Sequence, residues 1–173
     1  MATTANRLYP YPLSSAPVAP HTDIQALATA LDTDVQALYF PSWVTYGSAQ
    51  GLTWTGSIAN PTLGNGTLEG RYQLQGTKRI RFQILLTYGS TSTAGNGFWI
   101  FSLPFAADTD STKFALGVSH MDDISSQGRP GGTRFNSSTQ LIMDNSGGAV
   151  SGGTPAAPAS GDKYRLDITY DRV

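Results

Sequence analysis

The chain has 173 residues, which suffices for one domain with a sizeable core plus an appendage. Charged residues make up 13% of it, about half of the roughly 25% typical of soluble domains, and the formal net charge is −1. Without a basic run, nucleic-acid binding through phosphate neutralisation is not expected, and no apolar stretch approaches the ~20 residues that insert across a bilayer. The absence of cysteine excludes disulfides and thiolate metal sites.

Residues 1–21 are predicted to form an extended arm. The prolines of YPYP (9–12) and APVAP (16–20) fix φ and bias their predecessors away from helix. A disordered leader is one interpretation. The other is a docking peptide, because the arm carries apolar anchors that a spacer does not need, and such a segment orders against a partner surface. The predicted docking residues are Leu8, Tyr9, Pro10, Tyr11, Pro12 and Leu13.

Residues 22–39 are predicted to form a helix, with Thr22 or Asp23 as its N-cap. Its apolar residues are spaced alternately by four and three, which is the seam of a short coiled coil. Two heptads are too few to hold a coiled coil alone, so the helix either lies on its own domain or self-associates with help from the domain that follows. We favour self-association, through Ile24, Leu27, Ala28, Leu31, Val35 and Leu38.

Residues 40–173 are predicted to be a β-sandwich or jelly-roll head, which makes the chain mainly β. Segments 67–75, 79–89 and 163–170 alternate apolar and polar residues, as half-buried strands do, and QGTK (75–78) is a turn. The segment 98–105 is apolar on both faces and is expected to be buried on both sides, either between two sheets or between a sheet and a neighbouring subunit. Further strands are predicted at 113–121 and 138–144. The Gly/Ala/Pro-rich stretch 146–161 is a long loop whose role the pattern leaves open.

Catalytic residues, metal sites and cofactors are not expected. His120 lies at a strand end beside Asp122 and Asp123, without a marked nucleophile or further ligand. Asp108 and Asp110 lie in a polar turn that lacks the remaining ligands of a calcium loop. The sequence therefore predicts a binding or structural protein, not an enzyme.

Exposed aromatic residues offer one candidate contact surface. Trp43, Trp54 and Tyr46 flank a Gly-rich stretch and could stack on a host-surface glycan or on another subunit, whereas Trp99 is expected in the core. The residues alone do not choose between a sugar and a subunit.

Three segments together resemble a known group of proteins. YPYP, then PHTDIQALATALDTDVQAL, then PTLGNGTLEGRYQLQGTKRIRFQILLTYGSTSTAGNGFWIFSLP are similar to virion proteins of tailed bacteriophages, chiefly phages of actinobacteria. These proteins are described as minor tail or tail-fibre proteins, and some as head-fibre or capsid decoration proteins. The resemblance covers residues 6–106 and weakens over the last third.

The resemblance implies a homotrimer. Its arm would attach to a capsid or tail protein, the helix would form a three-helix collar, and the β head, matched at 64–72 and 87–104, would point outward. Because the chain has no shaft, a short fibre or decoration protein is expected rather than a long fibre; a glycan-binding tail-fibre module is the alternative. The opening MATTANR is not followed by the apolar run of a signal peptide, so we expect synthesis in the host cytoplasm and a place on the virion surface.

Overall fold

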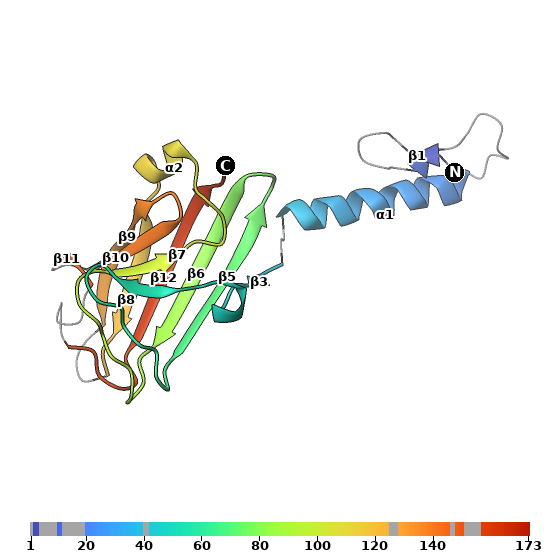
Figure 1. The fold of residues 1–173 in the computed structure, drawn as a ribbon. Coiled ribbons are helices and arrows are strands. Elements are labelled where there is room, and N and C mark those ends of the chain that lie inside the picture. Colours follow the sequence, from blue (N-terminus) through green and yellow to red (C-terminus); the bar gives the residue numbers. More distant parts are fainter. Residues whose placement is uncertain are drawn as a thin grey trace. The chain divides into compact units, whose positions relative to one another are not determined.

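A computed structural model describes residues 2–3, 10–11, 20–39, 42–124, 128–145, 148–150 and 157–173. The chain divides into two compact units, Met1–Ser42 and Trp43–Val173. The second unit is called the head below. Helices and strands are labelled in Figure 1.

The first unit contains a long helix and a minimal strand pair. The helix α1 spans Pro20–Tyr39, and β1 (Ala2–Thr3) pairs antiparallel with β2 (Pro10–Tyr11). The predicted helix is thus present, but it begins before Thr22, at a proline whose fixed φ suits a first helical turn. The arm also has strand pairing of its own, which its prolines did not indicate. Leu8, Tyr9, Pro12 and Leu13 lie outside the described residues.

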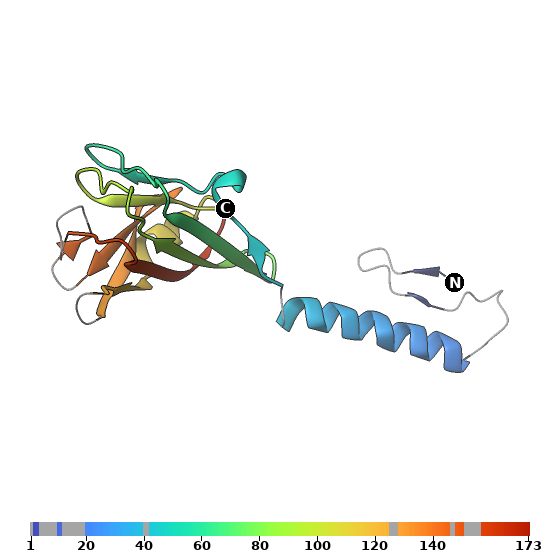
Figure 2. The same cartoon turned by 90° about the horizontal axis from the view of Figure 1, so that it is seen from below.

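Ten strands within the described part of the head form one antiparallel sheet that curls over on itself (Figures 1 and 2). Their order is β3-β5-β6-β12-β8-β9-β10-β7-β4, with β11 added to β10. The strands are β3 (Val44–Thr45), β4 (Trp54–Gly56), β5 (Thr67–Gln75), β6 (Arg79–Thr87), β7 (Trp99–Ser102), β8 (Gly117–Asp122), β9 (Arg129–Ser137), β10 (Gln140–Asn145), β11 (Gly148–Ala149) and β12 (Lys163–Asp171).

The strands β5 and β6 form a hairpin that is paired over nine residues of each strand. Its register pairs Thr67 with Thr87 and Gln75 with Arg79. Gly76 in the connecting turn has φ +72°, a conformation that residues with a Cβ rarely adopt. The alternation of the two strands buries one face of each, and β12 then pairs with β6 along its whole length.

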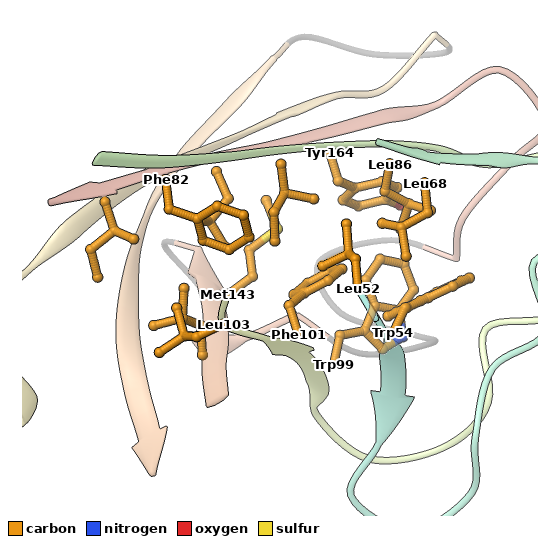
Figure 3. Packing of buried hydrophobic residues seen from close by; sticks show 14 of the residues in the cluster. Leu52, Trp54, Leu68, Phe82, Leu86, Trp99, Phe101, Leu103, Met143 and Tyr164 are labelled. Carbon is orange, nitrogen blue, oxygen red and sulfur yellow. The ribbon is translucent and has the colours of Figure 1, made fainter. Parts of the chain in front are cut away.

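The core lies between the two halves of the curled sheet (Figure 3). Phe82, Leu86 and Tyr164 face it from one half, and Trp99 and Phe101 from the other. The Trp99 ring packs edge-on against Trp54, at 4.9 Å between centroids, and against Tyr164, at 4.8 Å. Its Nε1 donates a hydrogen bond to the carbonyl of Ala94, so the most buried indole is also satisfied.

The prediction of a mainly β chain is confirmed, while the jelly roll and the trimer stay predictions. Three local features differ from the expectations. Within the single chain, strand β7 is buried on one face, since Ile100 and Ser102 are half-buried, and burial of its other face against a neighbouring subunit stays a prediction. Residues 113–114 end a short helix, α2 (Thr109–Phe114), and the strand β8 begins only at Gly117. Strand β9 was not expected, because Pro130, Gly131 and Gly132 resemble a loop.

Candidate functional site

The outer face of the sheet contains a hollow. Side chains of a strand alternate between its two faces, so the long strands that bury one set of residues present a second set outward. The register aligns these outward residues in two neighbouring rows across β5, β6, β12 and β8. With Thr45 and Gly47 they line a hollow of about 710 Å³, a volume usual for ligand sites. The rows are Arg71, Gln83, Asp167 and Val118, and Glu69, Leu85, Arg165 and His120.

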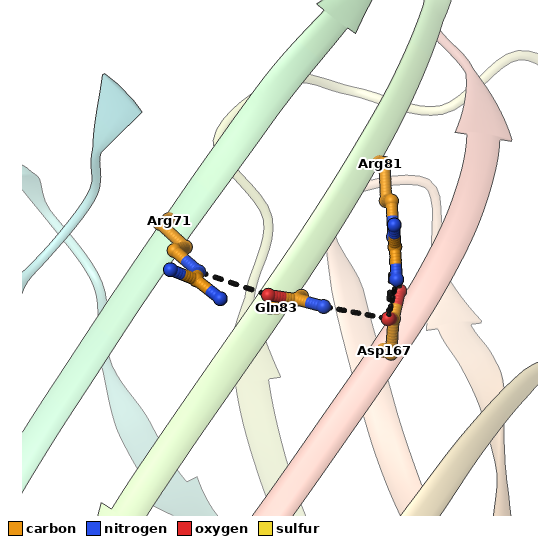
Figure 4. Close-up of polar contacts among 4 residues, drawn as sticks. All are labelled: Arg71, Arg81, Gln83 and Asp167. Carbon is orange, nitrogen blue, oxygen red and sulfur yellow. Dashed lines mark hydrogen bonds and ion pairs between the residues drawn. The ribbon is translucent and has the colours of Figure 1, made fainter. Parts of the chain in front are cut away.

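A polar network (Arg71, Arg81, Gln83 and Asp167) crosses three strands at this hollow (Figure 4). Arg71 Nε donates to Gln83 Oε1 at 2.9 Å, and Gln83 Nε2 donates to Asp167 Oδ2 at 2.7 Å. Arg81 Nη2 donates to the same carboxylate oxygen at 2.6 Å, and Arg81 Nε completes a forked contact. These hydrogen bonds hold the four side chains of the network in place without a ligand.

Partial burial pushes the pKa of Asp167 upward, but the hydrogen bonds from Arg81 and Gln83 outweigh it, so the pKa lies below its ordinary value. Asp122, two residues after His120 on β8, accepts a hydrogen bond from Arg165 Nη1 and lies 2.9 Å from His120 Nε2. The bond from Arg165 is the main cause of the lowered pKa of Asp122. Both carboxylates are therefore ionised near neutral pH and act as hydrogen-bond acceptors, a role that suits binding.

The structure separates the three predicted aromatic contact residues. The Arg71 guanidinium lies 4.4 Å from the centroid of the Trp43 ring, and that of Arg81 lies 5.7 Å from it, so Trp43 is a cation–π partner of the polar network. Trp54 is only 8% exposed and belongs to the core, which corrects its assignment to a contact surface. Tyr46 is half-buried, and its hydroxyl donates to the carbonyl of Leu103 at 3.0 Å. No single aromatic platform exists among them.

The helix α1 carries the second candidate surface, an apolar stripe (Ile24, Leu27, Ala28, Leu31 and Val35). All five residues are exposed in the single chain, Ile24 to 67% and Val35 to 46%. The side chain of Leu38, the last predicted seam residue, lies outside the described ones. The stripe is therefore apolar surface that the described part of one chain leaves open to solvent.

Asp108 has a structural role. It is the N-cap of α2, and its carboxylate accepts a hydrogen bond from the Ser111 backbone N–H at 2.7 Å, which lowers the pKa of Asp108.

Across the described ranges there is no group of three or more His, Cys, Asp or Glu side chains arranged to hold a metal ion. No helix in the same ranges is both long and apolar enough to cross a membrane.

Comparisons with protein-family models, with curated proteins and with solved structures found no match for this chain. The alternation of apolar and polar residues predicts outward positions for Arg81, Gln83 and Asp167, but it does not reveal the hollow, because it does not say which strands are neighbours.

Proposed function

We propose that the protein is a structural component of a tailed-bacteriophage virion, a short homotrimeric fibre or decoration protein. Its arm docks on a capsid or tail protein, α1 joins the copies, and the head is displayed on the particle. The single observation that supports this most is the exposed apolar stripe of α1. The number of copies, three, and the attachment to a virion are inferred from the resemblance of residues 6–106 to phage virion proteins.

The stripe favours association with copies of itself for an energetic reason. Fully burying a Val, Leu or Ile side chain stabilises by about 1.5–3 kcal/mol, and each copy offers four such side chains, Ile24, Leu27, Leu31 and Val35. The opposite face carries hydrogen-bonding residues, and Thr29 and Thr33 donate to backbone carbonyls one turn earlier. A helix with one apolar and one polar face is suited to a small bundle whose polar faces meet water.

The test is the oligomeric mass of a seam variant. Leu31→Asp with Val35→Asp introduces charges into the stripe, and we expect light scattering to report a monomer where the parent chain is a trimer. Thr29→Asp with Gln36→Asp adds the same charge on the opposite face and is expected to leave the mass unchanged. A parent chain that is itself monomeric, or a seam variant that keeps the parent's mass, would contradict the role of α1.

The docking role of the arm has its own test. Deleting residues 1–20 is expected to leave a folded oligomer that no longer binds particles assembled without the protein. The control is the full-length chain added to the same particles, measured by co-sedimentation. A truncated chain that still attaches would show that the arm is not the docking element.

A second candidate function is binding of a host-surface glycan, and the hollow favours it. Its floor carries Leu85, while Arg71 and Arg165 are balanced by Glu69 and Asp167, a mixture of donors and acceptors that suits a neutral polyhydroxyl ligand. Arg71→Ala with Trp43→Ala should abolish adsorption to host cells under this function and leave it intact under pure decoration. Trp54→Ala is unsuitable for that test, because Trp54 belongs to the core.

A further inference from the structure

Three large apolar side chains stand exposed together at the start of β8. Phe114, Leu116 and Val118, called the apolar row, are 78%, 82% and 66% exposed. They alternate with residues that face inward, since Ala115 packs against the core and Ser119 is buried. Alternate residues of an extended segment share one face, so Leu116 and Val118 lie on the outer surface of the sheet, with Phe114 directly before them.

The surroundings leave the apolar row open. Val118 is opposite Gly132 of β9, so the neighbouring strand offers no side chain directly opposite that residue. A Cβ built on Gly132 would meet its nearest atom at 3.8 Å, which shows room above the backbone. On its other side Val118 is opposite Asp167 and borders the hollow. Contiguous apolar surface of this kind marks an interaction site more often than chance exposure does.

The short connection between α1 and the head indicates what could cover the apolar row. Only residues 40–42 separate Tyr39, the last residue of α1, from Trp43, so the connection reaches at most ~14 Å. Helices in a bundle are about 8–10 Å apart. Two heads joined to bundled helices are therefore attached within roughly 40 Å of one another, close to the ~36 Å diameter of a domain of this size.

Neighbouring heads in such an oligomer meet at a high effective concentration, on the order of millimolar. A modest apolar contact is then enough to keep them together. The two-heptad α1, which is too short to hold a coiled coil alone, would gain the support that it needs from such a contact.

We propose that the apolar row is a head-to-head interface, covered by the head of a second copy of this chain in the oligomer. The inference rests on the proposed function, because it needs α1 to bring the copies together. It goes further by assigning residues of the head, and not only the helix, to the assembly.

Thiol accessibility tests this directly, since the natural chain has no cysteine. Leu116→Cys puts a single thiol in the apolar row, and Ile58→Cys, at a residue that is 75% exposed between β4 and β5, is the matched control. In the oligomer we expect the thiol at position 116 to react with a maleimide at least about tenfold more slowly than in the monomeric Leu31→Asp, Val35→Asp background. The thiol at position 58 should react equally fast in both.

The outcomes separate the two proposals. Equal rates at position 116 in the oligomer and in the monomer would overturn the head interface and leave the trimeric α1 standing. A parent chain that is monomeric would overturn the proposed function and the interface with it.

A second variant covers the case in which Leu116→Cys loosens the contact that it reports. Leu116→Asp should raise the protein concentration at which the oligomer dissociates by at least about tenfold, measured by light scattering on dilution, whereas Ile58→Asp should not change it. Dissociation at the same concentration in both variants and the parent overturns the head interface.

Discussion

The head and α1 treat their apolar residues in opposite ways. In the head, Phe82, Trp99 and Leu141 are fully buried between the halves of one curled sheet. In α1, Ile24, Leu31 and Val35 form a regular pattern and yet stay exposed in the single chain. The head is therefore expected to owe its stability to contacts within one chain, and α1 to contacts between chains. The first should not depend on protein concentration, and the second should.

The strongest test of this difference truncates one residue in each region. Trp99→Ala removes the ring that packs against Trp54 and Tyr164, and we expect the head to lose about 3–5 kcal/mol of unfolding free energy in urea titrations. Leu31→Ala should leave the head's unfolding midpoint unchanged and weaken only association. A comparable loss of head stability in both variants would show that α1 is part of the head's own fold.

A second test asks whether the head's interior has spare room. A Cβ added to Gly70 would collide with the carbonyl oxygen of Tyr46 and lie 2.8 Å from Leu52 Cδ2. Gly70→Ala should therefore destabilise the head by about 1–3 kcal/mol, measured by thermal unfolding. Gly132→Ala, whose new methyl group meets nothing closer than 3.8 Å, is the control and should be tolerated. Equal tolerance of both would contradict a closely packed interior.

A third test concerns local structure in the head that needs no partner. Asp108→Ala removes the N-cap of α2 and should lower the midpoint of urea unfolding, because the Ser111 N–H loses its acceptor. Asp108→Asn keeps an acceptor that caps equally well and should restore the parental value. Failure of the asparagine variant to restore stability would show that Asp108 acts by some route other than capping.

The smallest expected effect lies on the outer face, in the polar network. The pKa of Asp167 is lower in the folded chain than the ordinary value of about 3.9. Its ion pair therefore stabilises fully above that value, and the contribution is lost as pH falls through the folded pKa. Asp167→Asn should cost less than about 1 kcal/mol at pH 7, since such half-exposed pairs are weak.

The pH dependence provides the check on that small effect. Urea unfolding of the parent and of Asp167→Asn should differ at pH 7 and converge as the pH falls below the folded pKa of Asp167. A difference that persists in acid would mean that the asparagine disturbs packing rather than charge.

Local patterns predicted part of this fold well. Strands β5, β6 and β12 begin and end within two residues of the predicted segments, because alternation over nine residues is a strong signal. Strand β9 was missed because Pro130 and its glycines favour loops in isolation, and pairing with β8 and β10 overrides that preference. Helix α2 stands where the sequence predicts a polar turn, although Asp108 and Ser111 are the residues of an N-cap and its partner.

The hollow could not be predicted from the sequence for a related reason. The outward positions of Gln83 and Asp167 followed from alternation, but these residues are neighbours only because β12 lies beside β6. A periodic pattern does not say which of several strands pair when, like Gln83 and Asp167, their residues are 84 positions apart in the chain. The seam of α1 was visible because it depends on residues three and four apart.

The two strands at the ends of the sheet are short, which limits sheet-to-sheet association between molecules. β3 is two residues long, and β4, at the opposite end of the order, has three and closes on Gly56. Long sheet edges recruit strands from other molecules and lead to aggregation, and brief ones offer little backbone to extend. Neither β3 nor β4 therefore offers enough edge backbone to add a strand from a neighbouring molecule.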